Sequence, residues 1–192
     1  MYRRCRGGFR RGGGAVMSPL PDAPRALLLA RRALGAAAVG KRFPLPEDLP
    51  PEWTSRRAGV FLTLTRGNRV RACWGTLEPQ QRHLAAEIVA VAQGVLTRDT
   101  RFPPVRAEEL PQLRLLLTVV VSPPQPVHPA QIRPREHGVL VRCGHRSAVV
   151  LPHEGRTVRH LLYLAKQKAG IGEQEAVEVY RFRVFTVEEP HR

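Results

Sequence analysis

Cys73 and Arg71 are the residues of this chain whose types and spacing best suit chemistry. They stand two positions apart in the segment Val70-Arg-Ala-Cys-Trp-Gly-Thr76. A cysteine is nucleophilic as its thiolate, and a nearby guanidinium lowers a thiol pKa whereas apolar burial raises it. We predict Cys73 and Arg71 as a catalytic pair, with Gly75 and Thr76 in the wall of the same pocket. The competing interpretation is that Cys73 is a packed core cysteine.

A second polar group, Asp99, Arg101 and Phe102, follows the longest predicted helix. Asp99 can pair with a neighbouring arginine or cap the turn, and the two prolines after Phe102 stiffen the loop. We expect this group to form either a rigid structural corner or a pocket wall beside Cys73.

Cys143, His145 and His153 raise the question of a metal site. Structural zinc needs four ligands, commonly in close pairs. Cys143-Gly-His145 supplies one pair and the sequence offers no matching second pair, so we predict no metal. The sequence also lacks the glycine-rich nucleotide-binding motifs and the GxSxG serine motif, and we predict no cofactor.

Two similar units of strands and helices must position these residues. Segments 60–65 and 70–76 predict a β-hairpin, because both are short and largely apolar or β-branched, and Gly67-Asn68 suits a two-residue turn. A helix at 79–97 and a strand buried on both faces at 113–122 complete the first unit.

The same order of elements recurs from Gly138 onward. A hairpin around Gly144-His145 is followed by a helix at 157–169 and a strand at 177–187. We therefore predict an α+β fold, in which two β-hairpin–helix–strand repeats form one curved, barrel-like, mostly antiparallel sheet with helices outside. The two repeats span about residues 59–122 and 138–187.

A two-residue turn would also fix the pairing within the first hairpin. Leu62 would face Cys73 and Leu64 would face Arg71, so that Cys73 and Arg71 share a face with the apolar residues of the first strand. This register places the guanidinium close to the thiol.

Composition limits the class of protein. A length of 192 residues suits one compact domain, and the net charge of +15 suits a nucleic-acid or membrane-surface partner. All but three of the basic residues are arginines, scattered rather than set in a stripe with aromatic residues, which equally fits a compositional bias. Apolar runs fall far short of the roughly 20 residues that span a bilayer. Three cysteines without paired spacing fit a reducing compartment, so we predict a cytoplasmic protein with no membrane segment.

The first residues differ from the rest of the chain. Residues 1–17 are rich in arginine and glycine, and we predict a disordered basic tail there. The tail is either a nucleic-acid-binding arm or a mis-called start, in which case Met17 is the initiator. Residues 18–192 are predicted to form a single domain.

The order of several motifs resembles the AMMECR-one domain family, which includes protein A of the AmmeMemoRadiSam system. The resemblance covers about residues 24–187, and the chain departs from the family's motifs at Ala72, Trp74 and Thr100. The motifs are Gly59-Val-Phe-Leu-Thr-Leu64, Val70-Arg-Ala-Cys-Trp-Gly-Thr76, Asp99-Thr-Arg-Phe-Pro-Pro104, Glu108-Glu-Leu-Pro111, Val150-Leu-Pro152, Lys168-Ala-Gly170 and Tyr180-Arg-Phe182.

The resemblance implies two β-and-α repeats that share one barrel-like sheet. It implies no established reaction, and it associates the family with a Memo-like protein and a radical-SAM enzyme. We therefore expect a pocket protein or enzyme around Cys73 and Arg71 that acts with those two partners. The alternative is a module that binds nucleic acid or protein through its basic surface.

Overall fold

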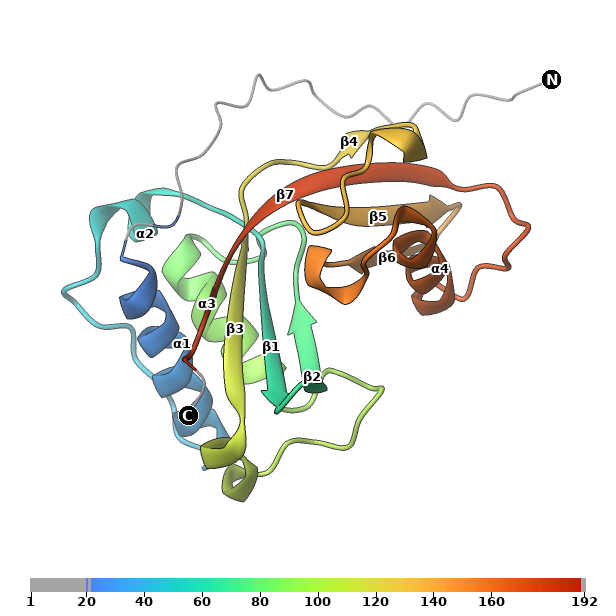
Figure 1. The fold of residues 1–192 in the computed structure, drawn as a ribbon. Coiled ribbons are helices and arrows are strands. Elements are labelled where there is room, and N and C mark those ends of the chain that lie inside the picture. The colour runs from blue at the N-terminus through green and yellow to red at the C-terminus, as the bar shows by residue number, and fades with distance from the viewer. Residues whose placement is uncertain (1–19, 21, 191–192) are drawn as a thin grey trace.

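The structure is a computed structural model that describes residue 20 and residues 22–190. In Figure 1 the long strand β7 (Glu178–Glu188) curves across the molecule and is shared by both halves. The other elements, in chain order, are α1 (Ala23–Ala38), α2 (Pro51–Ser55), β1 (Val60–Arg66), β2 (Arg69–Gly75), α3 (Leu84–Gly94), η1 (Ala107–Gln112), β3 (Arg114–Val120), β4 (Gln125–Pro126), η2 (Pro129–Gln131), β5 (His137–Cys143), β6 (Arg146–Val150), η3 (Pro152–Glu154) and α4 (Val158–Lys168).

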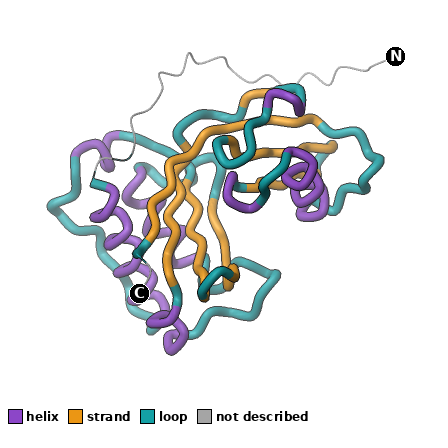
Figure 2. The backbone as a smooth tube through the Cα atoms, in the orientation of Figure 1, coloured by secondary structure: helices purple, strands orange, loops and turns teal. Residues whose placement is uncertain are grey.

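The strands form one antiparallel sheet in the order β2-β1-β3-β7-β5-β6, with the short β4 paired to β7. The first hairpin and β3 therefore mirror the second hairpin and β7 about the central β3–β7 pair. Strands β2 and β6 are the two edges, and the sheet curls into a half-barrel (Figure 2). The predicted fold class, with two repeats in one curved antiparallel sheet, is confirmed.

Helices cover the outer face of the sheet, as expected. Helices α1 and α3 pack on the first half, where Leu62, Leu117 and Val119 are fully buried. Helix α4 packs on the second half over Val139 and Val141. Each half thus buries its own apolar face, because alternate residues of each strand point toward the covering helix.

A smaller apolar cluster on the inner, concave face joins the two halves. Phe61 and Val120 of the first half pack there with Leu151 and Phe182 of the second. Gly138 permits this closeness, because a Cβ atom at that position would lie 2.2 Å from the ring of Phe182. The concave face is thereby divided into separate hollows on either side of this cluster.

The helix predicted at residues 79–97 is shorter in the structure, where it is α3 (Leu84–Gly94). It begins at Leu84 rather than at Pro79, and the His83 ring caps it by accepting from the Ala86 N–H at 3.1 Å. The preceding residues form a loop because the buried Glu87 carboxylate accepts from the N–H groups of Gln80 and Gln81, at 2.7 and 2.6 Å. A carboxylate in the first turn of the helix thus holds the loop in place.

The predicted tail at residues 1–17 lies outside the described residues. Within residue 20 and residues 22–190, no helix combines the length and the apolar character needed to cross a membrane.

Candidate functional site

The first hairpin has a different register from the one predicted. Thr63 pairs with Cys73 and Leu64 pairs with Ala72, and a bulge after Leu64 leaves Arg71 as the extra residue of β2. One inserted residue reverses which side of the sheet the following side chains face. Ala72 therefore enters the helix-covered core, where it is 1% exposed, and Cys73 turns to the concave face.

Burial decides the state of the Cys73 thiol. Burial raises its pKa above the usual 9.0, and the Thr63 hydroxyl, which donates to Sγ at 3.2 Å, offsets this only in part. The sequence left open whether a nearby guanidinium or apolar burial has the larger effect on the pKa of Cys73. In the structure, burial has the larger effect. The thiol is protonated at neutral pH in the free protein.

Arg71 is engaged elsewhere. Its Nε and Nη2 donate to the Glu109 carboxylate, both at 2.8 Å, and its remaining donors reach the carbonyls of Pro103 and Pro104 at 3.0 and 3.2 Å. The bond from Arg71, helped by the Arg106 backbone N–H, lowers the pKa of Glu109 to about 2. Arg71 thus links β2 to η1 and to the loop that precedes η1.

Asp99 ties that loop to the strand beside Cys73. Its Oδ2 accepts from the Cys73 backbone N–H at 2.8 Å, and Arg101 donates to both carboxylate oxygens, at 2.8 Å each. Burial alone would raise the pKa of Asp99, but the bonds from Arg101 and Cys73 outweigh it and hold that pKa below its usual value. Asp99 is therefore an ionised anchor that also orients Arg101.

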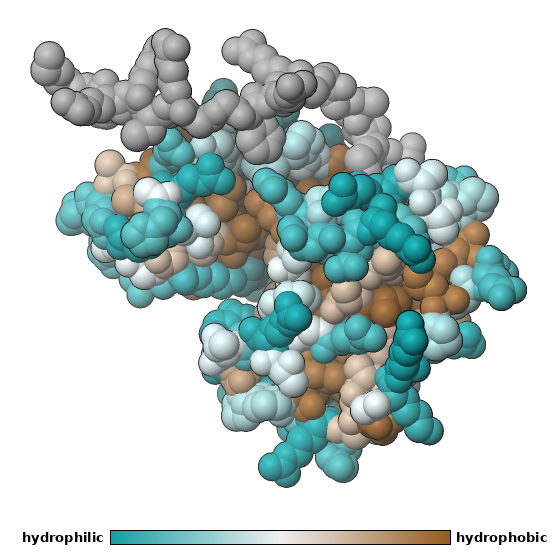
Figure 3. Space-filling view, turned by 180° about the vertical axis from the view of Figure 1, so that it is seen from behind, coloured by the Kyte–Doolittle hydropathy of each residue, from teal (hydrophilic) through white to brown (hydrophobic). Residues whose placement is uncertain are grey.

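A cavity of about 730 Å³ opens where the two edge strands of the half-barrel approach each other. We call it the seam cavity. Viewed from behind, the surface is indented between the two halves, and apolar side chains show in the indentation (Figure 3). The lining comes from β2, the 98–101 loop, β6, the segment after β6 and the end of α4. Its principal members are Phe61, Cys73, Trp74, Gly75, Leu77, Arg98, Asp99, Arg101, Val149, Leu151, Glu154 and Lys168.

Positively charged side chains outnumber negatively charged ones in the seam cavity. Arg101 is matched by Asp99, and Lys168 by Glu154 at 2.5 Å. Arg98 instead lies over the Trp74 ring, 4.9 Å from its centroid, and pairs with no carboxylate of the described residues. The cavity therefore carries one cation in excess, and its remaining walls are partly apolar and partly polar.

The structure gathers four of the predicted site residues: Cys73, Gly75, Asp99 and Arg101 all line the seam cavity. The other three lie around it. The Thr76 hydroxyl donates to Glu87 at 2.5 Å, the Phe102 ring lies under the Arg101 guanidinium at 5.5 Å, and Arg71 holds Glu109.

Residues from the second half of the chain were missed by reasoning from local sequence. Lys168 and Glu154 face Cys73 across the seam cavity, together with Gln167. Two signals were available, because Lys168 begins one of the family-like motifs and Glu154 comes two residues after Pro152, which ends another. Only the closing of the half-barrel brings them to the same site as Cys73.

Among the described residues, neither Cys73 nor Cys143 belongs to a metal cluster. Within the described part of the chain, no three His, Cys, Asp or Glu side chains come together in a way that could hold a metal ion. Cys143 is a free thiol, and its Sγ lies 3.6 Å from Arg146 Nη2 and 3.9 Å from Glu175 Oε2.

Fold and site together define an α+β protein with a half-barrel sheet and a cavity at its open seam. The AMMECR1 family profile matches residues 27–188. A Thermotoga maritima protein is 41% identical over 150 residues, covering 76% of this chain and 86% of the relative. The crystal structure of the uncharacterized protein PH0010 from Pyrococcus horikoshii matches with a TM-score of 0.77 at 30% identity, over 86% of this chain and 90% of that one.

A Methanosarcina acetivorans protein is also 32% identical over 184 residues, covering 86% of this chain and 91% of the relative. The chain belongs to the AMMECR1 family.

Proposed function

We propose that the seam cavity binds a small organic anion and that Cys73 forms part of the wall of this binding site. The observation that carries the proposal is the exposed Arg98, which has no carboxylate partner among the described residues, at a concave and partly apolar site. A volume of about 730 Å³ falls within the range of small-molecule sites, which combine apolar walls with a few placed polar groups.

Each wall has a role in this proposal. The apolar part of the ligand packs on Phe61, Leu77 and Val149, and its anionic group lies between Arg98 and Lys168. Lys168 also donates to the Val149 carbonyl at 3.4 Å, so its ammonium is held at the edge of β6. A ligand anion competes there with Glu154 for the same ammonium.

Cys73 takes part as a protonated thiol in the free protein. Its raised pKa leaves little thiolate at neutral pH, so nucleophilic chemistry requires a ligand or partner that adds positive charge beside it. Joint action with a Memo-like protein and a radical-SAM enzyme is supported by the family resemblance alone. In that part of the proposal, one of these partners adds the positive charge beside Cys73.

A titration with matched probes tests the proposal. Benzoate and uncharged benzyl alcohol are compared by ¹⁵N NMR on the full chain, which reports shifts of the Cys73, Gly75 and Lys168 amides. We expect benzoate to shift these amides and benzyl alcohol to shift them far less. Arg98→Gln should weaken benzoate binding, whereas Arg69→Gln on the exposed hairpin end should leave it unchanged. Equal binding of the two probes, or equal losses in the two variants, contradicts the proposal.

A further inference from the structure

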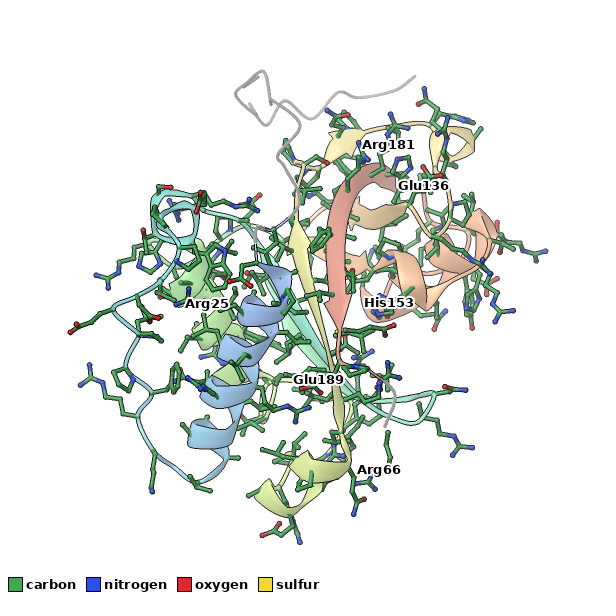
Figure 4. The ribbon with its side chains drawn as sticks, turned by 60° about the vertical axis from the view of Figure 1, so that its left-hand side comes forward. Arg25, Arg66, Glu136, His153, Arg181 and Glu189 are labelled. Carbon is green, nitrogen blue, oxygen red and sulfur yellow. The ribbon has the colours of Figure 1, made fainter. Side chains whose placement is uncertain are left out.

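A second hollow of about 730 Å³ lies on the concave face, beyond the apolar cluster that joins the halves. Its floor includes Leu116 of β3 and Val184 of β7. Its walls come from η3, the residues that follow η3 and the turn before β5. Figure 4 shows Glu136 of that turn and His153 of η3 on the same side of β7. We call this the arginine hollow, after Arg135, Arg156 and Arg183 in its lining.

The carboxylates that line the arginine hollow form ion pairs with arginines that lie outside it. Glu136 pairs with Arg133 at 3.7 Å, and Glu188 pairs with Arg114 at 3.2 Å. Neither Arg133 nor Arg114 lines the hollow. The guanidinium groups of Arg135 and Arg156 take part in no ion pair with another described residue. The hollow therefore presents positive charge that the fold itself does not neutralise.

Arg135 is held in an unfavourable backbone conformation. Its φ of 72° is in the left-handed region, which among the described non-glycine residues only Asp22 shares. The turn is closed on both sides: the His137 N–H donates to the Arg133 carbonyl at 3.0 Å, and the Arg133 N–H donates to the His137 ring at 3.0 Å. Such strain, about 1 kcal/mol or more, persists where the surrounding structure imposes it and is frequent at ligand sites.

The segment η3 separates the two cavities. Glu154 lines the seam cavity, whereas its neighbours Pro152 and His153 line the arginine hollow. The side chain of His153 is exposed, but desolvation by its neighbours lowers its pKa below the usual value, with Glu154 and Glu188 opposing and Lys168 assisting. The imidazole is therefore neutral at pH 7 and can both donate and accept a hydrogen bond.

We propose that the arginine hollow binds a small phosphorylated molecule, with its phosphate between Arg135 and Arg156 and its organic part on Leu116 and Val184. Planar guanidinium groups match phosphate oxygens in paired hydrogen bonds, and two of them balance a dianion. The apolar floor suits an ester better than inorganic phosphate. A concave site of this size favours a small molecule over a nucleic-acid strand, whose backbone follows an extended basic groove. This inference stands apart from the function proposed for the seam cavity.

The test uses phenyl phosphate as the probe and ¹⁵N NMR as the readout, on the full chain at constant ionic strength. We expect shifts at the amides of Leu116, Val184 and Gly155. The double variant Arg135→Gln/Arg156→Gln should bind at least about tenfold more weakly. Two single variants serve as controls in which the shifts of these three amides should match wild type: Arg159→Gln, an exposed arginine of α4 outside the hollow, and Arg98→Gln, which changes only the seam cavity.

Four results overturn the proposal. They are no shift of these three amides at millimolar phenyl phosphate, an equal loss of their shifts in Arg159→Gln, loss of their shifts in Arg98→Gln, or tighter binding of a thymidine oligonucleotide through Arg135 and Arg156. The last result would assign these arginines to nucleic acid. A circular dichroism spectrum of the double variant separates lost binding from lost folding.

Discussion

At the scale of single residues, the environment of Cys73 is set by neighbours that lie far away in the sequence. The thiol faces the concave side because Arg71 is the extra residue of a bulge, and Arg71 is held by Glu109, 38 positions further on. The motifs pointed to Cys73 and left open whether Asp99 and Arg101 form a structural corner or a pocket wall beside it. They could not predict the side of the sheet, since the bulge depends on packing between distant segments.

The Cys73 thiol should ionise at unusually high pH. We expect its alkylation by iodoacetamide to rise with a midpoint above pH 9, because burial raises its pKa. Thr63→Val should move the midpoint higher, since the Thr63 hydroxyl stabilises the thiolate. Rates measured by peptide mass spectrometry, with Cys143 in the same digest as the reference, check this. A Cys73 midpoint below 8.5 would contradict the account.

The ion pair between Arg71 and Glu109 should stabilise the protein in a pH-dependent way. The pKa of Glu109 is about 2 in the folded protein and 4.5 ordinarily, so the stabilisation is complete above pH 4.5 and is lost as the pH falls toward 2. Glu109→Gln should cost about 1 kcal/mol at pH 7, because the pair is partly exposed. Urea denaturation at several pH values tests this.

Glu108→Gln is the matched control, because Glu108 is the exposed neighbour of Glu109. It should change the free energy of unfolding little at any pH. The cost of Glu109→Gln should shrink below pH 4.5, and a cost that stays constant down to pH 3 would show that the pair does not act through charge.

At the scale of elements, the 98–104 loop is positioned by side-chain bonds to an edge strand. Edge strands leave backbone groups unpaired, and here Asp99 accepts from the Cys73 N–H on β2 while Lys168 donates to the Val149 carbonyl on β6. The proline-rich sequence indicates a stiff loop. Its attachment to β2 follows only from the folded arrangement.

Asp99→Asn should loosen this loop without unfolding the protein. The variant keeps an acceptor for the Cys73 N–H but loses the ion pair with Arg101, and we expect a loss of about 1–3 kcal/mol because the Asp99 carboxylate is buried. Hydrogen exchange at the Cys73 amide should become faster. Asp48→Asn, an exposed carboxylate paired with Arg25, should cost less than about 1 kcal/mol. Equal losses in the two variants would contradict the anchoring role.

At the scale of the whole molecule, the strand β7 belongs to both halves and makes them one unit. It pairs with β3 on one side and with β5 on the other. The repeated order of hairpin, helix and strand was readable from the sequence, because the turn residues and apolar runs are local signals. The approach of the two edge strands around one cavity could not be read from the sequence, because it depends on the curl of the whole sheet.

We therefore propose that the described chain unfolds as a single cooperative domain. Leu117→Ala in the first half and Leu161→Ala in the second should each cost about 2–5 kcal/mol, because both side chains are fully buried. Both tryptophans lie in the first half. If the domain is single, Leu161→Ala shifts the tryptophan fluorescence transition and the circular dichroism transition equally. A fluorescence transition that stays in place would instead show two independent units.

Charge-selective alkylation of Cys73 can show whether the seam cavity binds anions beside this thiol. Iodoacetate and iodoacetamide react with Cys73 at pH 9.5 in wild type, Arg98→Gln and Arg69→Gln, and the ratio of their rates is compared. We expect Arg98→Gln to lower the iodoacetate-to-iodoacetamide rate ratio about threefold, because an unmatched cation attracts the anionic reagent, and Arg69→Gln to leave the ratio unchanged. An unchanged ratio in Arg98→Gln, or a Cys73 that reacts only after unfolding, would contradict anion binding in the seam cavity.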